Sequence, residues 1–330
     1  MILNKNIMKT PILSRFAGTL FIATTFLFLF SSCKKNIVQE QSLQDESLFE
    51  KSEAASNSGL FVSAADTAAA VKNLYYYDAT DPKNIMENAY ASGAKDGNGV
   101  WYNKKTDEVY QLSRKNKTIY VFSNASSLTD PPVASRTLSD ITLSSGREIA
   151  YDKWHDVLFI SNNIDSTIRV YRNFSSLSGS IIGEVLKISG QPWGITYDDA
   201  TDRLLVVIDL AAMRIEVYDA PASLSAGTVT ASSTFNITNR PNGTYSRLHG
   251  ITYNSKKGIM LVTEIGEAIA PPTPTPGKPL FNADGGVYVF KNVNAKINAG
   301  GSYAANAVIY GANTGLGNPV DIDMRNIDGN

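Results

Sequence analysis

A strand that ends in an aromatic residue recurs five times along this chain. The final aromatics are residues 77, 122, 171, 218 and 290, so the spacings are 45, 49, 47 and 72 residues. Two apolar segments joined by a polar turn precede most of these strands, and a fourth short segment follows before a Gly or Pro. A period in the forties with four short strands per unit is typical of blades repeated around an axis. The sequence therefore predicts an all-β fold, a β-propeller of four-stranded antiparallel blades, with about five blades present.

The units share an internal order of segments. Each opens with a short apolar run that we expect to be the innermost strand of its blade: Gly99–Tyr102, Glu148–Tyr151, Gly194–Tyr197, Gly250–Tyr253 and Asp321–Met324. Second segments such as Leu204–Ile208 are almost continuously apolar, which predicts strands that are buried on both faces. Fourth segments such as Ile181–Leu186 are less regular, as expected of outer edge strands.

Some of these segments resemble the NHL and YVTN-type propellers of exported bacterial proteins. The likeness is carried by Leu158–Asn163 followed by Thr167–Tyr171, by Gln191–Asp198 and by Gly311–Pro319, and it covers roughly residues 59–330. It implies the propeller fold and no particular activity. The Gly-His and Trp-Asp pairing of WD40 repeats and the Gly-Gly signature of kelch repeats are both missing.

The repeat is out of phase at its two ends. The first unit begins at its second strand, Leu60–Ser63, and the last unit stops after its first, Val320–Met324. One alternative is a closed five-bladed ring in which the C-terminal strand completes the N-terminal blade. The other is a chain truncated at its C-terminus, which is favoured because Arg325–Asn330 has the composition of a hairpin turn with no strand after it. In either case the edge of the N-terminal blade needs a partner.

The first 35 residues have the organisation of an export signal. Basic residues precede an uncharged run over residues 16–30, which is too short to span a membrane, and small residues follow it. The sequence Ser31-Ser32-Cys33 at its end resembles the lipobox of bacterial lipoproteins, with Phe30 in place of the usual Leu, a variation associated with the Bacteroidota. This resemblance implies cleavage before Cys33 and acylation of that residue. The alternative is an ordinary secretory signal with an incidental cysteine.

These features predict the organisation and location of the chain. We expect a lipoprotein signal peptide over residues 1–32, a flexible polar tether over 33–58 and the propeller over 59–330. Cys33 is the only cysteine, so an exported protein of this kind has no disulfide framework. Lys34 follows it in place of the Asp that resembles an inner-membrane retention signal. We therefore expect an outer-membrane lipoprotein of the periplasm or the cell surface, held to the membrane through lipidated Cys33.

Charge composition excludes one class of partner. The chain carries 30 basic and 31 acidic residues, mixed throughout, and its net charge is −1. Nucleic-acid binding needs a basic patch or stripe, and the sequence has none.

Polar side chains lie directly ahead of the apolar residue that anchors each innermost strand. The beginnings of these strands gather on one face of a propeller, around its central channel. The candidate ligand-binding residues are therefore Asn98, Arg147, Glu148, Trp193, His249 and Asp321. Together they predict a site for a polar small molecule, a glycan or a peptide, with Trp193 as a stacking surface. The alternative is that they pair with one another and with water in a polar channel and have no further role.

Catalysis has weaker support in the sequence. His249 is one of two histidines, and the other, His155, lies in a turn on the opposite face beside Trp154. No Ser or Cys nucleophile with a recognisable motif accompanies His249, so we assign no catalytic residue. The Pro-rich stretch 271–279 lies between a second and a third strand and is expected to project from the same face as His249. It is either a semi-rigid arm over the site or a neutral insertion.

Oxygen-bearing side chains that follow second strands suggest a metal site as an alternative. They are Asn162, Asp165, Asp209, Glu264 and Glu267, and such ligands suit Ca²⁺. The regucalcin and gluconolactonase propellers use a Glu, two Asn and an Asp around one divalent ion. Glu148, Asn162 or Asn163, and Asp209 resemble that set in part, although the Glu-Gly-Pro opening of the family is missing. We expect no cofactor, with Ca²⁺ as the alternative.

The function that the sequence favours is a lipid-anchored, non-enzymatic envelope propeller that binds a glycan, a peptide or an envelope protein at its channel face. Two alternatives remain. One is a divalent-metal-dependent, lactonase-like hydrolase, and the other is an architectural scaffold protein.

Overall fold

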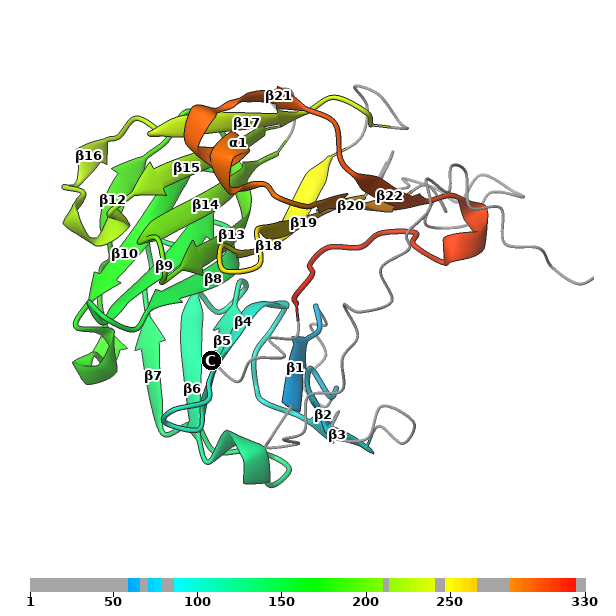
Figure 1. Ribbon diagram of the computed structural model, residues 1–330. Helices are drawn as coiled ribbons and strands as arrows, with labels where there is room; N and C mark the ends of the chain where they lie inside the picture. Colours follow the sequence, from blue (N-terminus) through cyan, green and yellow to red (C-terminus); the bar gives the residue numbers. More distant parts are fainter. Residues whose placement is uncertain are drawn as a thin grey trace, which may run out of the picture. The chain divides into compact units, whose positions relative to one another are not determined.

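A computed structural model describes residues 59–65, 71–78, 86–209, 214–240, 247–265 and 285–324. These residues form five small, mainly antiparallel sheets, which are the blades of an all-β, five-bladed β-propeller (Figure 1). The predicted fold class is confirmed. Cys33, the expected signal peptide and tether, and the Pro-rich stretch 271–279 lie outside the described residues.

The blades follow one another along the chain. Blade 1 consists of β1 (Gly59–Ser63), β2 (Leu74–Asp78) and β3 (Met86–Tyr90). Blade 2 consists of β4 (Gly97–Asn103), β5 (Glu108–Ser113), β6 (Thr118–Ser123) and β7 (Arg136–Ser139). Blade 3 consists of β8 (Gly146–Asp152), β9 (Val157–Asn162), β10 (Thr167–Arg172) and β12 (Glu184–Lys187). Blade 4 consists of β13 (Pro192–Asp198), β14 (Arg203–Ile208), β15 (Arg214–Asp219) and β17 (Ser233–Ile237). Blade 5 consists of β18 (Leu248–Asn254), β19 (Ile259–Glu264), β20 (Gly286–Phe290) and β22 (Ala307–Tyr310).

The order of strands within a blade agrees with the sequence pattern. The first strands of neighbouring blades contact one another, β4 with β8, β8 with β13 and β13 with β18, so they surround the centre. All six residues of β9 and five of the six in β14 are buried, as their continuous apolar character predicts. The third strands end in buried aromatics in four blades: Phe122, Tyr171, Tyr218 and Phe290.

The apolar core lies between blades. Four clusters of buried side chains each join two successive blades. Between blades 4 and 5, for example, the rings of Phe235 and Phe290 meet edge to face with centroids 5.1 Å apart. Full burial of one such side chain contributes about 1.5–3 kcal/mol to folding, which is how face-to-face blades hold together.

Short parallel strands join the blades at their outer edges. The connection between the third and fourth strands of blade 3 adds β11 (Gly179–Ser180) to β7 of blade 2. In the same way β16 (Gly227–Thr228) pairs with β12, and β21 (Gly301–Tyr303) pairs with β17. The single strand predicted over Ile181–Leu186 is therefore wrong in its bounds, because this connection first pairs with the neighbouring blade and β12 begins only at Glu184. The added strands cover edges that would otherwise be open to other chains.

Helical structure is limited to connections. The described residues include one α-helix, α1 (Asn294–Ala299), and single 3₁₀ turns such as η3 (Phe174–Ser176). No helix in this part of the chain is long and apolar enough to cross a membrane.

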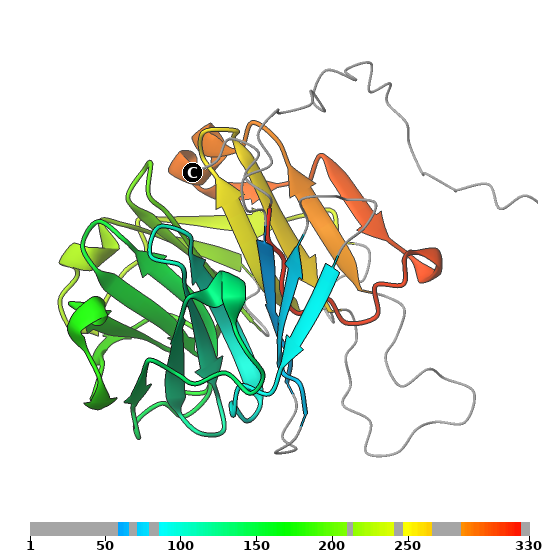
Figure 2. The same ribbon diagram turned by 90° about the horizontal axis from the view of Figure 1, so that it is seen from below.

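The C-terminal segment differs from its prediction. The strand expected over Asp321–Met324 is not formed in the described residues, although the segment contacts blade 5, where Thr252 Oγ1 donates a hydrogen bond to Asp323 Oδ1 over 3.3 Å. Figures 1 and 2 both show this segment, in red, passing beside β1. It thus lies next to the inner edge of blade 1 without a regular strand ladder. Residues 325–330, the expected hairpin turn, lie outside the described residues.

Candidate functional site at the channel rim

The four first strands of blades 2 to 5 share a β-bulge at the same place. Between Pro192 and Ile195 of β13, two residues face one residue of β14, and the same register shift occurs in β4, β8 and β18. The bulged pairs are Asn98-Gly99, Arg147-Glu148, Trp193-Gly194 and His249-Gly250. A bulge turns a side chain away from the alternation of the strand and is common beside binding sites. All the candidate residues of these four strands therefore occupy bulge positions.

In three of the four bulges, glycine at the second position allows the strands to approach closely. A Cβ atom at Gly194 would lie closer than 3.0 Å to the carbonyl oxygen of His249 and 3.1 Å from Ile251 N, and one at Gly99 would lie 2.7 Å from Ile149 N. Hydroxyl groups of the second strands hold the bulges in place. Glu148 N donates to Ser161 Oγ over 2.9 Å.

Trp193 lies between side chains from both neighbouring blades. Its ring is stacked on the ring of His249, with centroids 3.6 Å apart and planes only 8° from parallel. The guanidinium carbon of Arg147 lies 4.0 Å from the centre of the Trp193 ring. Because the imidazole covers one face, Arg147 must lie over the other. The stacking surface expected for a ligand is thus occupied by protein groups, and the arrangement is a stack of Arg147, Trp193 and His249.

Two ion pairs flank this stack. Arg247 donates from Nε to Asp209 Oδ1 over 2.9 Å and makes a second bond from Nη2 to the other oxygen of the same carboxylate. Arg114 Nε donates to Asp96 Oδ2 over 2.6 Å. Arg147 makes no hydrogen bond or ion pair with any described residue, and its Nε is buried. Three guanidinium groups and two carboxylates therefore leave one positive charge in excess.

The surroundings lower the pKa values of Arg147 and His249, the two titratable groups of the stack. Burial, followed by repulsion from Arg114, lowers the pKa of Arg147 to about 10, so it remains charged at neutral pH. Burial, with Arg247 and Arg147 nearby, lowers the pKa of His249 to about 2. His249 is only 2% exposed, and neither ring nitrogen makes a hydrogen bond with a described residue. A neutral imidazole with so low a pKa is a weak base, which disfavours His249 as a general base in this state.

Glu148 and Asp321 form a separate acidic pair. The Glu148 side chain extends over Gly99, and the carboxyl of Asp321 lies beside it. Burial among protein atoms, and then the charge of Asp321, raises the pKa of Glu148. Burial likewise raises the pKa of Asp321 to about 6. Two adjacent carboxyl groups that share a proton are the simplest account of both shifts.

In the structure the six predicted residues thus fall into a stack of three, an acidic pair and one separate residue. Arg147, Trp193 and His249 are in contact with one another. Glu148 and Asp321 pair with each other, and Asn98 donates from Nδ2 to the backbone oxygen of Asp96 over 2.9 Å.

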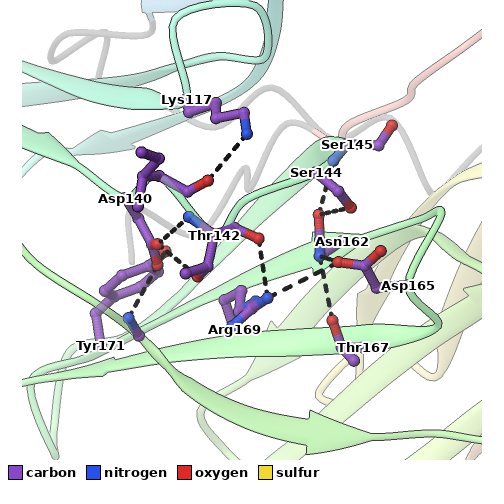
Figure 3. Close-up of polar contacts among 12 residues, drawn as sticks. Lys117, Asp140, Thr142, Ser144, Ser145, Asn162, Asp165, Thr167, Arg169 and Tyr171 are labelled. Atoms are coloured by element: carbon purple, nitrogen blue, oxygen red, sulfur yellow. Dashed lines mark hydrogen bonds and ion pairs between the residues drawn. The ribbon is translucent and has the colours of Figure 1, made fainter.

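The predicted metal ligands that the structure describes already make hydrogen bonds or ion pairs with other protein groups. Asn162 accepts from Ser145 N and donates to Asp165 Oδ2 over 2.9 Å, within the polar network that Figure 3 shows. Asp209 is bonded to Arg247, and Glu264 accepts from Arg240 Nε over 3.1 Å and from the Tyr288 hydroxyl. Glu267 lies outside the described residues. Within the described ranges, none of the aspartates and glutamates among these predicted ligands belongs to a cluster whose ligand atoms are spaced as in a metal site.

Another acidic cluster lies at the far end of β8. Within the described ranges, Asp152, His155 and Asp202 are the three residues whose ligand atoms are spaced as in a metal site. Asp152 already accepts from Trp154 N over 2.9 Å and lies 2.6 Å from His155 Nδ1. These bonds stabilise the turn between β8 and β9, and nothing further points to an ion there.

Three charged residues of the rim, Asp96, Arg114 and Arg247, were not among the predicted site residues, and Asp209 was expected only as a candidate metal ligand. Asp96 and Arg247 directly precede first strands, and Arg114 and Asp209 directly follow second strands. Backbone hydrogen bonds pair the residue after a second strand with the residue before the first strand of the same blade. Arg114 N donates to Asp96 O in blade 2, and Asp209 N donates to Gln191 O in blade 4. Extending the repeat alignment by one residue beyond each strand identifies Asp96, Arg114 and Arg247 as well.

Hollows elsewhere on the surface are separate from the rim. One of about 420 Å³ is lined by Ser189, Arg214 and Thr228 between blades 3 and 4. Another of about 460 Å³ is lined by Lys117, Ile141 and Ile182 between blades 2 and 3. Both are formed by outer strands and connections.

Comparison with known proteins agrees only at the level of fold. No protein-family model matches the chain, and no curated protein matches it. Among solved structures, the nidogen chain of a nidogen/laminin complex is similar with 13% identity and a TM-score of 0.44, over 78% of this chain and 94% of that one. Hydrazine synthase of Kuenenia stuttgartiensis is similar with 10% identity and a TM-score of 0.39, over 59% of this chain and 62% of that one. This chain therefore matches less than two thirds of the length of the hydrazine synthase chain.

Proposed function

We propose that this protein is a non-enzymatic binding module of the bacterial envelope and that it binds a polar ligand at the channel rim. The observation that carries the proposal is the shared bulge, which brings Arg147, Trp193 and His249 from three successive blades into one stack. Polar groups that converge at the end of a propeller channel are a common basis for ligand recognition.

Three features of the rim support binding over a purely structural role. Arg147 has no carboxylate partner among the described residues, and the ring nitrogens of His249 are buried without hydrogen bonds. Unpaired buried polar groups destabilise a fold, so proteins retain few of them without a functional reason. The low pKa of His249 favours binding over acid–base catalysis.

We further propose that the propeller is an NHL- or YVTN-like lipoprotein of Bacteroidota type, anchored in the outer membrane. This rests on the sequence from Phe16 to Lys34 and on the need for two or more acyl chains for stable anchoring. In cell fractionation, Cys33→Ser should release soluble protein or leave the precursor uncleaved. Unchanged recovery with membranes would contradict the anchor.

Paired tryptophan variants test the binding site. Glycan and peptide libraries are screened first with the full chain, and any ligand found is titrated against Trp193→Ala and Trp154→Ala. Trp154 is 70% exposed in the turn between β8 and β9, at the other end of the blade, and serves as the control. Trp193→Ala should weaken binding several-fold, a loss on the order of 1 kcal/mol, because it removes the central ring of the stack. Equal effects of the two variants would exclude the rim as the site.

A further inference from the structure

We propose that the rim recognises a single carboxylate group, which binds between Arg147 and His249 at the edge of the Trp193 ring. This inference rests on the proposed binding function and specifies the chemistry of its ligand.

The first support is the unused hydrogen-bonding capacity of Arg147. Its guanidinium makes no hydrogen bond or ion pair with a described residue, whereas Arg114 and Arg247 on either side are each bound to an aspartate. A guanidinium presents a planar fork of N–H groups that fits a carboxylate with two parallel bonds. Contact with the Trp193 ring orients the guanidinium without using those donors.

The second support is His249, which is an independent observation. Its ring is 98% shielded from solvent, yet both nitrogens lack a hydrogen-bond partner among the described residues, and the nearest carboxylate oxygen, Asp209 Oδ2, is 4.0 Å from Nε2. A buried imidazole normally has at least one partner. A ligand oxygen at the rim would supply the acceptor that its N–H group lacks.

The third support is the balance of charge. The groups that act on Arg147 are Arg114, Asp96, Arg247 and Asp209, and with Arg147 itself they carry one net positive charge. A monoanion neutralises this excess. The faces of Trp193 are occupied, so the ligand meets the edge of its ring, whose hydrogens carry partial positive charge and also favour an anion.

The test is a titration of the full chain with sodium glucuronate and sodium acetate at constant ionic strength, with glucose as the neutral control. Binding is followed by the rise in melting temperature and by NMR of the histidine Cε1 protons. The chain has only two histidines, so His155→Asn identifies the signal of His249. We expect both carboxylates to raise the melting temperature and to shift the His249 signal, and glucose to do neither.

Two charge variants locate the effect. Arg147→Gln should weaken carboxylate binding roughly tenfold or more, since bonds to charged groups are stronger than neutral ones. It should lower the melting temperature of the ligand-free protein only slightly, because the guanidinium has no carboxylate partner among the described residues and the variant loses only its contact with the Trp193 ring. Lys153→Gln removes one positive charge from the exposed turn beside Trp154 and should leave carboxylate binding unchanged.

Each other outcome overturns the inference in a recognisable way. Binding of sulfate or phosphate in preference to carboxylates would replace the proposed chemistry. A neutral ligand that requires Trp193 but not Arg147 would overturn the carboxylate inference and leave the proposed binding function intact. If carboxylates do not bind and no ligand in the libraries depends on Trp193, both proposals are wrong.

Discussion

Substitution of Gly194 by alanine tests whether close approach of the inner strands creates the site. The backbone at Gly194 is not in the left-handed region, so alanine is compatible with its local conformation. The added methyl group would nonetheless overlap the carbonyl oxygen of His249 and lie 3.1 Å from Gly250 Cα. These are backbone atoms of β18, which cannot rotate away as a side chain does.

The size of the effect follows from this geometry. To accommodate the methyl group, β13 and β18 must separate by roughly 1 Å along an interface packed with fully buried side chains such as Leu205 and Val262. Overpacking of this kind costs about 1–3 kcal/mol, and rigid backbone neighbours place Gly194→Ala at the upper end. For a domain of this size, about 3 kcal/mol corresponds to a loss of roughly 6–12 °C in melting temperature.

Gly146→Ala is the matched control for this experiment. It lies just before the bulge of β8, and its Cβ would meet only side-chain methyl groups, Leu112 Cδ2 at 3.0 Å and Ile160 Cγ2 at 3.4 Å. We expect it to cost about 1 kcal/mol or less, because those groups can shift. Thermal unfolding followed by circular dichroism measures both variants.

A second readout links the fold to the site. The same separation of strands should disturb the stacking of Trp193 on His249, and the near-ultraviolet dichroism of tryptophan should change in Gly194→Ala but not in Gly146→Ala. Equal melting temperatures for the two variants would refute the steric argument. A destabilised Gly194→Ala protein with unchanged tryptophan dichroism would refute the link between strand approach and the stack.

The sequence predicted the parts of the fold that repeat. Strand type, strand order and the buried aromatic ends of the third strands all follow from local alternation and a period in the forties, and the structure agrees with them. Local patterns suffice here because each blade buries its faces against identical neighbours.

The parallel strands between blades were beyond such reasoning. β11 and β16 contain two residues each, too few for any hydrophobic period, and both pair with a blade other than their own. A weak signal does exist, since each begins with a glycine at positive φ, Gly179 at 78° and Gly227 at 128°, one or two positions after the serine of a Leu-Ser pair. These glycines indicate a parallel strand only when the strand with which it pairs in the preceding blade is already known.

The candidate site was predicted in position but not in arrangement. Alignment of the repeats located the bulge residues Arg147, Trp193 and His249, because the bulge itself is part of the repeat. Their stacking depends on side-chain directions that the bulge alters, and no linear pattern encodes those directions. The pairing of Glu148 with Asp321 depends on contact across the ring between segments 173 residues apart, which sequence spacing alone cannot indicate.

Two further predictions concern a buried tyrosine and the Glu148–Asp321 pair. Tyr171→Phe should destabilise the protein by about 1–3 kcal/mol in urea unfolding, because it removes the hydroxyl that donates to buried Asp140 over 2.9 Å, and an unchanged unfolding midpoint would contradict that role. Stability should also fall as pH rises from about 4 through about 6, because the raised pKa values of Glu148 and Asp321 mean that the folded state binds protons more tightly than the unfolded chain does. The stabilisation is complete while both carboxyls are protonated and is lost as the shared proton leaves. Solvent reaches Asp321, so we expect a loss of no more than about 1 kcal/mol. Glu148→Gln keeps a neutral donor beside Asp321 and removes the repulsion, so urea unfolding between pH 4 and 8 should show a flatter profile than the unmodified protein. Because Asp323 also has a raised pKa, caused mainly by burial, a small slope should remain. An unaltered slope in Glu148→Gln would show that the two carboxyls do not share a proton across the channel.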